Sequence, residues 1–200
     1  MPNARPQTPG RRERNKQEKL ARITAAAGEL FLEHGVDDVT TQQIADRADI
    51  GTGTLFLYAK TKSELLLLVQ NSFYADALVR GRAAAARIED TLGAVMAIVR
   101  PVVECNRTRV DNGRTYLREI VFGDPDEPHH SAALALTVET EGEIASVLLR
   151  DEAADPARAE MTAHIVSAIM FVAMAASFNA DRSVEDLLRE IEAQVAVLLQ

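Results

Sequence analysis

Residues 36–65, VDDVTTQQIADRADIGTGTLFLYAKTKSEL, decide the fold of this chain. Thr40 and Gln43 have the spacing of a capping box, in which the Thr hydroxyl accepts from the Gln backbone NH and the Gln side chain reaches back to the cap. Thr61 and Glu64 repeat this spacing. The stretch therefore predicts that one helix begins just after Thr40 and another just after Thr61.

A tight turn separates two short helices between these caps. Ile44 and its neighbours give the first helix, 41–48, an apolar face at helical spacing. Asp49 ends that helix, because Asp tolerates a left-handed backbone. Gly51 is an acceptable N-cap for a second helix over 52–58. Two short helices joined in this way form a helix-turn-helix.

The second short helix has the composition of a surface that meets DNA. Its residues are small, hydroxyl-bearing or apolar, and two turns of helix are enough to present one face to the major groove. Thr hydrogen-bonds base edges or touches a thymine methyl, whereas Leu57 makes only the apolar contact. The alternative is a plain helical hairpin inside a core, for which threonines are poor filler.

The same stretch resembles the DNA-binding domain of the tetracycline-repressor (TetR) family of bacterial transcription regulators. The resemblance covers about residues 20–66 and is carried by Phe31, His34, Gly35, Thr40, Thr41, Ile44, Ala45, Ala48, Gly53, Thr54, Leu55, Phe56, Tyr58, Lys60, Lys62 and Leu65. It implies an all-α fold, with an N-terminal three-helix helix-turn-helix domain and a larger C-terminal helical domain for ligand binding and dimerisation.

The resemblance also implies which residues contact double-stranded DNA. The residues expected at the interface are Thr41, Gln42, Thr52, Gly53, Thr54, Leu57, Tyr58, Lys60 and Lys62. Of these, Gln42, Thr52 and Leu57 would face bases, and Thr41, Tyr58 and the lysines would hold phosphates. Because one recognition helix reads few bases, a homodimer with its two helices about 34–36 Å apart would read a palindromic operator.

The hydrophobic pattern outside this stretch is helical throughout, and it contains no β-hairpin signal and no repeat. An amphipathic helix over 16–33 completes the small domain. The expected divisions are a flexible basic arm over 1–15, a helix-turn-helix DNA-binding domain over 16–63 and an effector-binding and dimerisation domain over 64–200.

Two local sequence features are expected to interrupt the helices of the larger domain. Pro101 follows an apolar helical run and is expected to kink or break it. Asn112-Gly113 is expected to form a turn.

Charge is distributed unevenly along a chain whose formal net charge is −8. Residues 1–22 carry seven Lys/Arg and two Glu, a net of +5, whereas residues 64–200 carry 12 basic and 22 acidic residues, a net of −10. A basic end on an acidic body orients a protein on a polyanion. Residues 11–19, RRERNKQEK, are either an arm that reaches phosphates or a minor groove, or a solvated tail.

The last two predicted helices, to about Asn179 and Leu199, have broad apolar faces. We expect the pair to meet its copy across a two-fold axis as a four-helix bundle, as in the family resembled. An intramolecular core is the alternative. The expected interface consists of Ile165, Ala168, Ile169, Val172, Ala176, Leu187, Ile191, Val195 and Leu198.

A small-molecule effector is expected to bind among the helices of the larger domain. Aromatic, Met, Cys and His residues are the candidates for lining its pocket, although such residues also pack ordinary cores. These candidates are Met96, Cys105, Tyr116, Phe122, His164, Met170, Phe171, Met174 and Phe178. Arg109, Arg114 and Arg118 would suit an anionic effector or are simply solvated.

Several other functions find little in the sequence. No catalytic motif is present, so we expect no enzyme, no cofactor and no metal site. The Asp/Glu/His loop over 124–130 lacks a metal-ligand spacing and is expected to be solvated. Met161–Ala180 has no charged residue, but it is too weakly apolar for a membrane span and is expected to be a buried helix.

The sequence thus predicts a cytoplasmic, sequence-specific DNA-binding transcriptional regulator, a repressor released from its operator by a small-molecule effector. The single Cys105 suits a reducing compartment. The alternatives are a helical small-molecule-binding protein and an enzyme on a helical scaffold.

Overall fold

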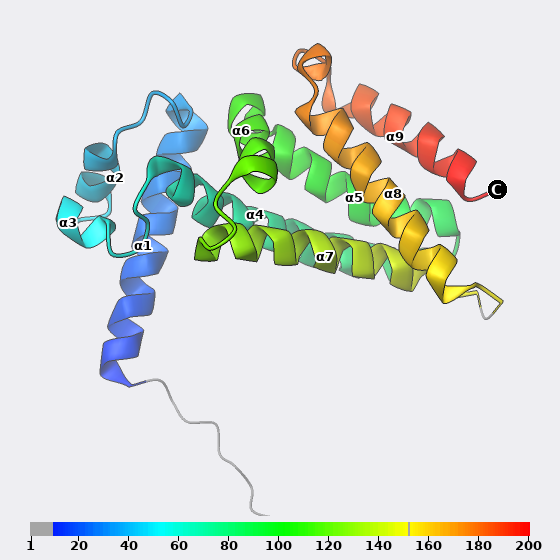
Figure 1. Cartoon of the computed structure of the whole chain (residues 1–200), viewed down its shortest axis with the longest axis horizontal. Coiled ribbons are helices and arrows are strands. Elements are labelled where there is room, and N and C mark those ends of the chain that lie inside the picture. Colours follow the sequence, from blue (N-terminus) through cyan, green and yellow to red (C-terminus); the bar gives the residue numbers. More distant parts are fainter. Residues whose placement is uncertain (1–9, 152) are drawn as a thin grey trace, which may run out of the picture.

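The computed structural model describes residues 10–151 and 153–200, which contain helices and no strand (Figure 1). The elements are α1 (Arg11–His34), α2 (Thr41–Arg47), α3 (Thr52–Leu55), α4 (Lys62–Ala85), α5 (Thr91–Arg107), α6 (Val110–Phe122), α7 (Pro128–Leu148), α8 (Pro156–Ala175), the 3-10 helix η1 (Ser177–Asn179) and α9 (Val184–Leu198). The all-α fold is confirmed, with a helix-turn-helix domain at the N-terminus and a larger helical domain after it.

The first capping box is formed as predicted. Gln43 donates its backbone NH to the Thr40 hydroxyl over 3.2 Å, and its Oε1 accepts from the Thr40 backbone NH over 2.8 Å. Asp49 has a φ of 53°, the left-handed backbone expected of the turn. At the second site only half of the predicted box forms: the Thr61 hydroxyl accepts from the Glu64 backbone NH, whereas the Glu64 side chain accepts from the Lys60 backbone NH, and α4 begins there.

Two predicted boundaries in this domain are wrong. The helix α1 begins at Arg11, so residues 11–15 are helical and not a flexible arm; residues 1–9 lie outside the described part of the chain. The second short helix ends at Leu55, and hydrogen-bonded turns carry the chain to Ala59. Gly53 weakens so short a helix, and the backbone must become extended before the cap of α4.

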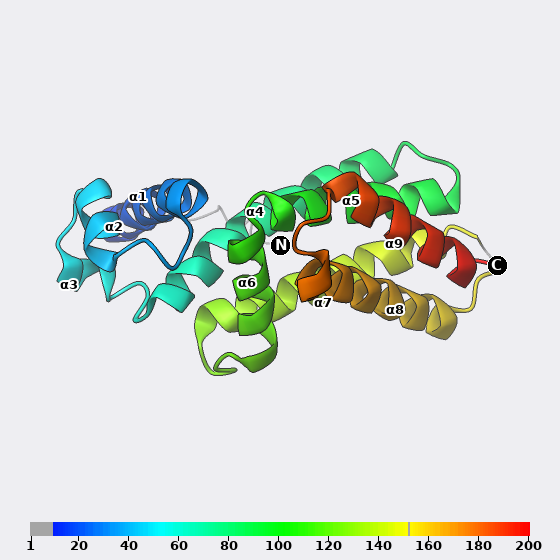
Figure 2. The same ribbon diagram turned by 90° about the horizontal axis from the view of Figure 1, so that it is seen from above.

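Helix α4 connects the two domains and packs along both α1 and α5 (Figures 1 and 2). Its contact with α5 is close because Gly81 has no side chain: a Cβ there would stand 2.9 Å from the Ile98 Cα. The helix-turn-helix lies at one end of an elongated molecule, and α8 and α9 lie toward the other end (Figure 2).

Neither predicted interruption ends a helix of the larger domain: the turn predicted at Asn112-Gly113 is wrong, and Pro101 does not break α5. Helix α5 runs through Pro101, because its buried residues pack against α4 and this packing outweighs the hydrogen bond that Pro cannot donate. Asn112 and Gly113 lie inside α6. Gly113 is required by a close crossing, since a Cβ there would stand 2.1 Å from the Asn106 carbonyl oxygen.

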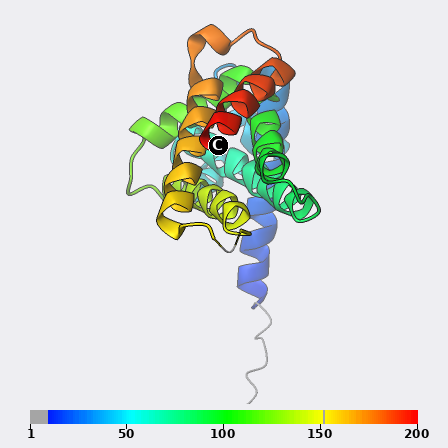
Figure 3. The same ribbon diagram turned by 90° about the vertical axis from the view of Figure 1, so that its right-hand side faces the viewer.

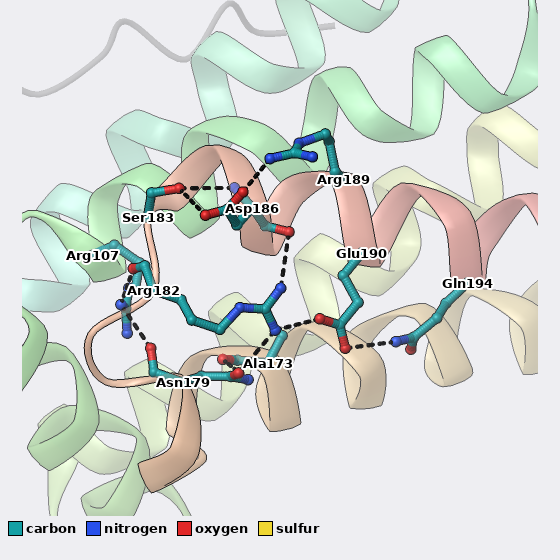
Figure 4. Close-up of polar contacts among 9 residues, drawn as sticks. All are labelled: Arg107, Ala173, Asn179, Arg182, Ser183, Asp186, Arg189, Glu190 and Gln194. Carbon is teal, nitrogen blue, oxygen red and sulfur yellow. Dashed lines mark hydrogen bonds and ion pairs between the residues drawn. The ribbon is translucent and has the colours of Figure 1, made fainter.

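The corner between α8 and α9 is drawn in orange at the top of Figure 3, and a buried arginine, shown in Figure 4, holds it. The Arg107 side chain donates to the carbonyl oxygens of Asn179, Ala180 and Arg182 over 2.8–3.0 Å. Burial lowers the pKa of its guanidinium. Arg182 in turn binds the Asn179 side chain and Glu190, so the connection between the two C-terminal helices has a fixed path.

The two domains are joined where α6 begins beside the end of α1. The Asn112 side chain accepts from the Val36 backbone NH over 2.8 Å and donates to the Phe31 carbonyl oxygen over 2.7 Å. Arg109 donates to the carbonyl oxygens of Leu32 and Glu33. The side chains of Asn112 in α6 and of Arg109, its N-cap residue, therefore bind carbonyls at the end of α1, a role usually filled within the helix terminus itself.

We predict that Gly35→Ala destabilises the protein by about 1–3 kcal/mol in urea unfolding. Gly35 ends α1 with φ 88° and ψ 153°, a conformation almost restricted to Gly. An added Cβ would also stand 2.9 Å from Arg109 Nε. Gly142→Ala in α7, where a Cβ meets open space, is the matched control and should stabilise by about 0.5–1 kcal/mol. Equal effects of the two changes would contradict this account of the joint.

Candidate nucleic-acid interface

The segment that follows the tight turn presents apolar side chains to solvent. Leu57 is 83% exposed and Phe56 is 45% exposed, whereas Leu55 is fully buried and anchors the segment on the domain core. Gly53 is exposed, and Thr52 and Thr54 are half-buried. Exposed apolar side chains carried on an anchored segment are suited to contact with another molecule.

The structure brings together two of the predicted base-facing residues. The Thr52 hydroxyl donates to Gln42 Oε1 over 2.7 Å, and Gln42 Nε2 donates to Asp46 Oδ1 over 2.7 Å. These two hydrogen bonds fix the Gln42 amide across the junction of α2 and α3. A preorganised amide loses less side-chain entropy when it binds a base edge.

The predicted phosphate contacts lie around the same segment in different environments. Lys60 is exposed, and Lys62 Nζ donates to the Asp37 carbonyl oxygen over 2.9 Å. An ammonium has three donors, so Lys62 keeps two for a phosphate. Thr41 is half-buried at the start of α2, and the Tyr58 hydroxyl lies 3.4 Å from the Lys16 carbonyl oxygen of α1.

The early start of α1 adds basic side chains to this side of the domain. The side chains of Arg11, Arg12, Arg14, Lys16, Lys19 and Arg22 are exposed on the helix. The Tyr58 contact shows that this part of α1 runs beside residues 52–58, which we call the recognition segment. Arg22 also pairs with Asp49 of the turn over 3.5 Å. The sequence predicted the charge and a helix from residue 16, but not that Arg11, Arg12 and Arg14 also lie on this helix.

His129 of α7 contacts the recognition segment directly, a contact that sequence reasoning missed. Its Nε2 lies 3.0 Å from the Tyr58 carbonyl oxygen, which can only accept, so Nε2 carries the proton in this hydrogen bond. His129 and Tyr58 are 71 residues apart, and no local pattern pairs them.

The acidic loop that leads into α7 has structural roles. Glu127 caps α7 by accepting from the backbone NH groups of His129 and His130, and Asp124 accepts from Asp126. His130 is buried, with Nε2 3.1 Å from the Ile120 carbonyl oxygen. Among the described residues no three His, Cys, Asp or Glu side chains are grouped as metal ligands.

The predicted pocket residues separate into different places. Tyr116, Met170, Phe171 and Met174 line one cavity of about 80 Å³ inside the larger domain. Cys105 lines another of about 240 Å³, between α1, α4 and the α5–α6 corner. We predicted one pocket from these residues, because periodicity shows which residues face inward but not which helices they meet.

Four other candidates do not line either cavity. His164 is exposed and pairs with Glu141 over 3.1 Å, Phe178 is 77% exposed, and Met96 packs against the core. Phe122 is 82% exposed and lies at an open depression that Arg114 and Arg118 also line. Of the arginines proposed for an anionic effector, Arg109 and Arg114 already donate to backbone carbonyls, Arg114 to that of Ala175.

The predicted dimer face is divided by the structure into core and surface. Leu187, Ile191 and Val195 are buried within the protomer, where α9 packs against α5 and α8, so they belong to its core. Ile165, Ala168 and Val172 face solvent on α8, and Ile169, Ala176 and Leu198 are half-buried. Exposed Met161 and Val197 extend this apolar surface and were missed.

Helix α8 is long and apolar enough to cross a membrane by length and composition alone. The mean hydropathy of its most apolar 18-residue stretch is only 1.2, and 28% of that stretch is buried in the protomer. Because α6, α7 and α9 pack against it, α8 is a helix of the larger domain with one apolar face left uncovered, not the wholly buried helix predicted.

The geometry defines a helix-turn-helix domain mounted on a larger helical domain, and comparison with known proteins agrees. Residues 23–69 match the family model described as "Bacterial regulatory proteins, tetR family". No curated protein matches the chain. The resemblance to the TetR family is thus confirmed on the helix-turn-helix domain.

Solved structures of TetR-family regulators share the fold over nearly the whole chain. A transcriptional regulator from Rhodococcus sp. RHA1 has a TM-score of 0.68 at 18% identity and covers 90% of this chain and 96% of its own. A TetR-family regulator from Streptomyces coelicolor has a TM-score of 0.66 at 21% identity, with coverages of 94% and 91%. The Thermus thermophilus FadR repressor in complex with lauroyl-CoA has a TM-score of 0.64 at 21% identity, with coverages of 88% and 93%.

We predict that Cys105 reacts slowly with thiol reagents at neutral pH. Burial raises the pKa of its thiol from 9.0 to about 11. The reactive thiolate is then about a hundredfold scarcer at pH 7, and the rate should rise about tenfold per pH unit up to a pH of about 11. Chain unfolded in guanidinium is the control and should level off about two units lower. A folded-state rate that levels off near pH 9 would contradict the burial.

Proposed function

We propose that this protein is a cytoplasmic, homodimeric transcription regulator that binds a palindromic operator and represses transcription until a small-molecule effector releases it. The observation that carries the proposal is the exposed, anchored segment from Thr52 to Tyr58, within a domain that matches the TetR family. An enzyme on this scaffold has no supporting constellation among the described residues, and a binding protein without DNA does not account for exposed Leu57.

Recognition is proposed to divide between base and phosphate contacts. Gln42, Thr52 and Leu57 face the bases, Thr54 lies in the same interface, and Gly53 has no neighbour within 4 Å of a Cβ, so its face is open to the duplex. Thr41, Tyr58, Lys60 and Lys62 hold phosphates. The exposed basic residues of α1 add attraction for the backbone, which is independent of sequence and decreases with salt.

Dimerisation is proposed to occur through α8 and α9. Val172 is 59% exposed, Met161 61% and Val197 69%, which is unusual for three apolar side chains on neighbouring helices of one domain. A second copy with the same surface buries them reciprocally around a two-fold axis. Two recognition segments then lie on one duplex and read the two halves of a palindrome.

Effector release is proposed to act through hydrogen bonds between the inner cavity and the recognition segment. Tyr116, which lines the 80 Å³ cavity, donates from its hydroxyl to Asn71 Oδ1 over 2.8 Å. Asn71 Nδ2 donates to the His129 carbonyl oxygen over 2.8 Å, and the His129 side chain binds the Tyr58 carbonyl oxygen. A ligand that enlarges the cavity displaces Tyr116, and this series of hydrogen bonds transmits the displacement to Tyr58.

Tyr116 and its neighbour Tyr74 are suited to transmit the effector signal because both side chains stay neutral. Burial raises the pKa of both Tyr74 and Tyr116, so each phenol keeps its proton. Their rings lie 4.8 Å apart, and Asn106 donates to the Tyr74 hydroxyl over 2.6 Å. An effector that prefers the released arrangement by about 1.4 kcal/mol weakens operator binding about tenfold.

Operator binding is tested by selecting genomic fragments with the whole protein and then measuring affinity for the selected duplex. Leu57→Ala should weaken binding to this operator about tenfold, because an apolar contact worth about 1.4 kcal/mol is lost, and should leave nonspecific binding unchanged. Val79→Ala, at a side chain 55% exposed on α4, is the matched control and should bind like the parent. Failure to select any duplex would overturn the proposal.

The phosphate contacts are tested by salt dependence. Lys60→Ala and Lys62→Ala should each weaken binding to operator and random duplex alike, and each should lower the slope of log affinity against log salt by about one. Unchanged slopes would remove these lysines from the interface.

The dimer is tested by light scattering. The protein should elute with twice the 21.8 kDa mass of one chain. Val172→Glu should give the monomer, because two-fold symmetry places a buried carboxylate on both sides of the interface. Val138→Glu, at a side chain 68% exposed on α7, is the control and should stay dimeric. A monomeric parent protein at micromolar concentration would contradict the assembly.

A further inference from the structure

We propose that the cavity between the two domains binds a small neutral aromatic amide or lactam. The cavity has a volume of about 240 Å³. A cavity of roughly 150 Å³ is enough to hold benzene. Its walls come from α1, from α4 and from the corner between α5 and α6. It shares no lining residue with the 80 Å³ cavity of the larger domain, and it does not rest on the proposed regulatory function.

The walls of this interdomain cavity favour a flat apolar molecule. Phe31 of α1 and Phe73 of α4 line it together with the aliphatic side chains of Leu66 and Val69. At Gly28 the two helices approach closely, because a Cβ there would stand 3.2 Å from the Phe73 ring. Two aromatic walls interact most favourably with a planar ring, which stacks on them or meets them edge to face.

A buried amide supplies the polar recognition. Gln70 is only 6% exposed and lines the cavity, so its amide is offered to a molecule that occupies that space. Buried amides are almost always hydrogen-bonded. Its neighbour Asn71 shows the usual state, because Asn71 donates to the His129 carbonyl oxygen and accepts from Tyr116.

The chemical class of the ligand follows from these groups. The Gln70 amide offers two donors and an acceptor, and an amide or lactam complements both kinds of group at once. Arg109 Nε is buried without a partner among the described residues and lines the same cavity, so it can donate to a ligand carbonyl. Asp76 and Arg80 are exposed at the rim with opposite charges, which favours no net charge on the ligand.

The position of the cavity ties its occupancy to the relative placement of the domains. Phe31 and Leu32 belong to the helix that ends at the Asn112 and Arg109 contacts, whereas the remaining walls belong to the larger domain. Any movement of α1 against α4 changes the shape of the cavity. A bound ligand therefore favours the domain arrangement in which both walls touch it.

Cys105 provides a direct probe, because it lines the cavity and is the only cysteine of the chain. The rate at which a small methanethiosulfonate modifies it is measured at a pH of about 9 with benzamide or toluene present. We expect benzamide at about 10 mM to slow the reaction about threefold or more. Gln70→Met should abolish the benzamide effect, whereas toluene should slow the reaction similarly in both proteins.

Gln70→Met keeps the length of the side chain and replaces a buried amide with an apolar thioether, so its melting temperature should be no lower than that of the parent. An unchanged labelling rate with benzamide would overturn the site, and protection that survives Gln70→Met would overturn amide recognition. Methyl NMR separates the two cavities: benzamide should shift the resonances of Leu66 and Val69. Shifts confined to Met170 and Met174 would place benzamide in the other cavity and overturn the proposal. Neither measurement uses DNA, so a failure of operator binding leaves them unaffected.

Discussion

The structure depends on one buried side chain at the joint between its domains. Asn112 accepts from the Val36 backbone NH and donates to the Phe31 carbonyl oxygen, so a single amide satisfies both sides of the break after α1. Asn112 is 2% exposed, and without it the buried Val36 NH would lose its partner at the cost of desolvating one backbone group, since the Phe31 carbonyl also accepts from the Gly35 NH. The orientation of the helix-turn-helix on the larger domain is therefore held by α6 as well as by α4, which packs along α1 and is the covalent connection.

Two further contacts make this joint continuous with the recognition segment. Ser63, at the start of α4, lies 3.2 Å from Glu119 of α6, and His129 of α7 binds the carbonyl of Tyr58. Together with Asn112 they place the end of α1, the turn after α3 and the start of α4 in contact with α6 or α7. A change in α6 or α7 thus acts on the DNA-binding domain at several points at once, which suits a regulator better than a flexible tether would.

Local patterns predicted the helix-turn-helix because its stability is largely local. The Thr40 box and the left-handed Asp49 follow from side chains and backbone within a few residues of each other. Asn112-Gly113 misled for the same reason: the dipeptide favours a turn in isolation, but burial against α1 and the tight crossing on Asn106 hold it in a helix. The apolar faces of α8 and α9 were recognised, but periodicity could not tell that Ile191 meets α5 while Val172 meets solvent. Pairings such as His129 with Tyr58 leave no trace in a single sequence.

The Arg107 anchor has a consequence for how this protein can diverge. The Nη2 group of Arg107 serves the carbonyls of Asn179, Ala180 and Arg182 in the α8–α9 corner, which requires that corner to keep its length and path. Homologous chains with a longer or shorter corner should have exchanged this arginine, and the angle between their last two helices should differ accordingly.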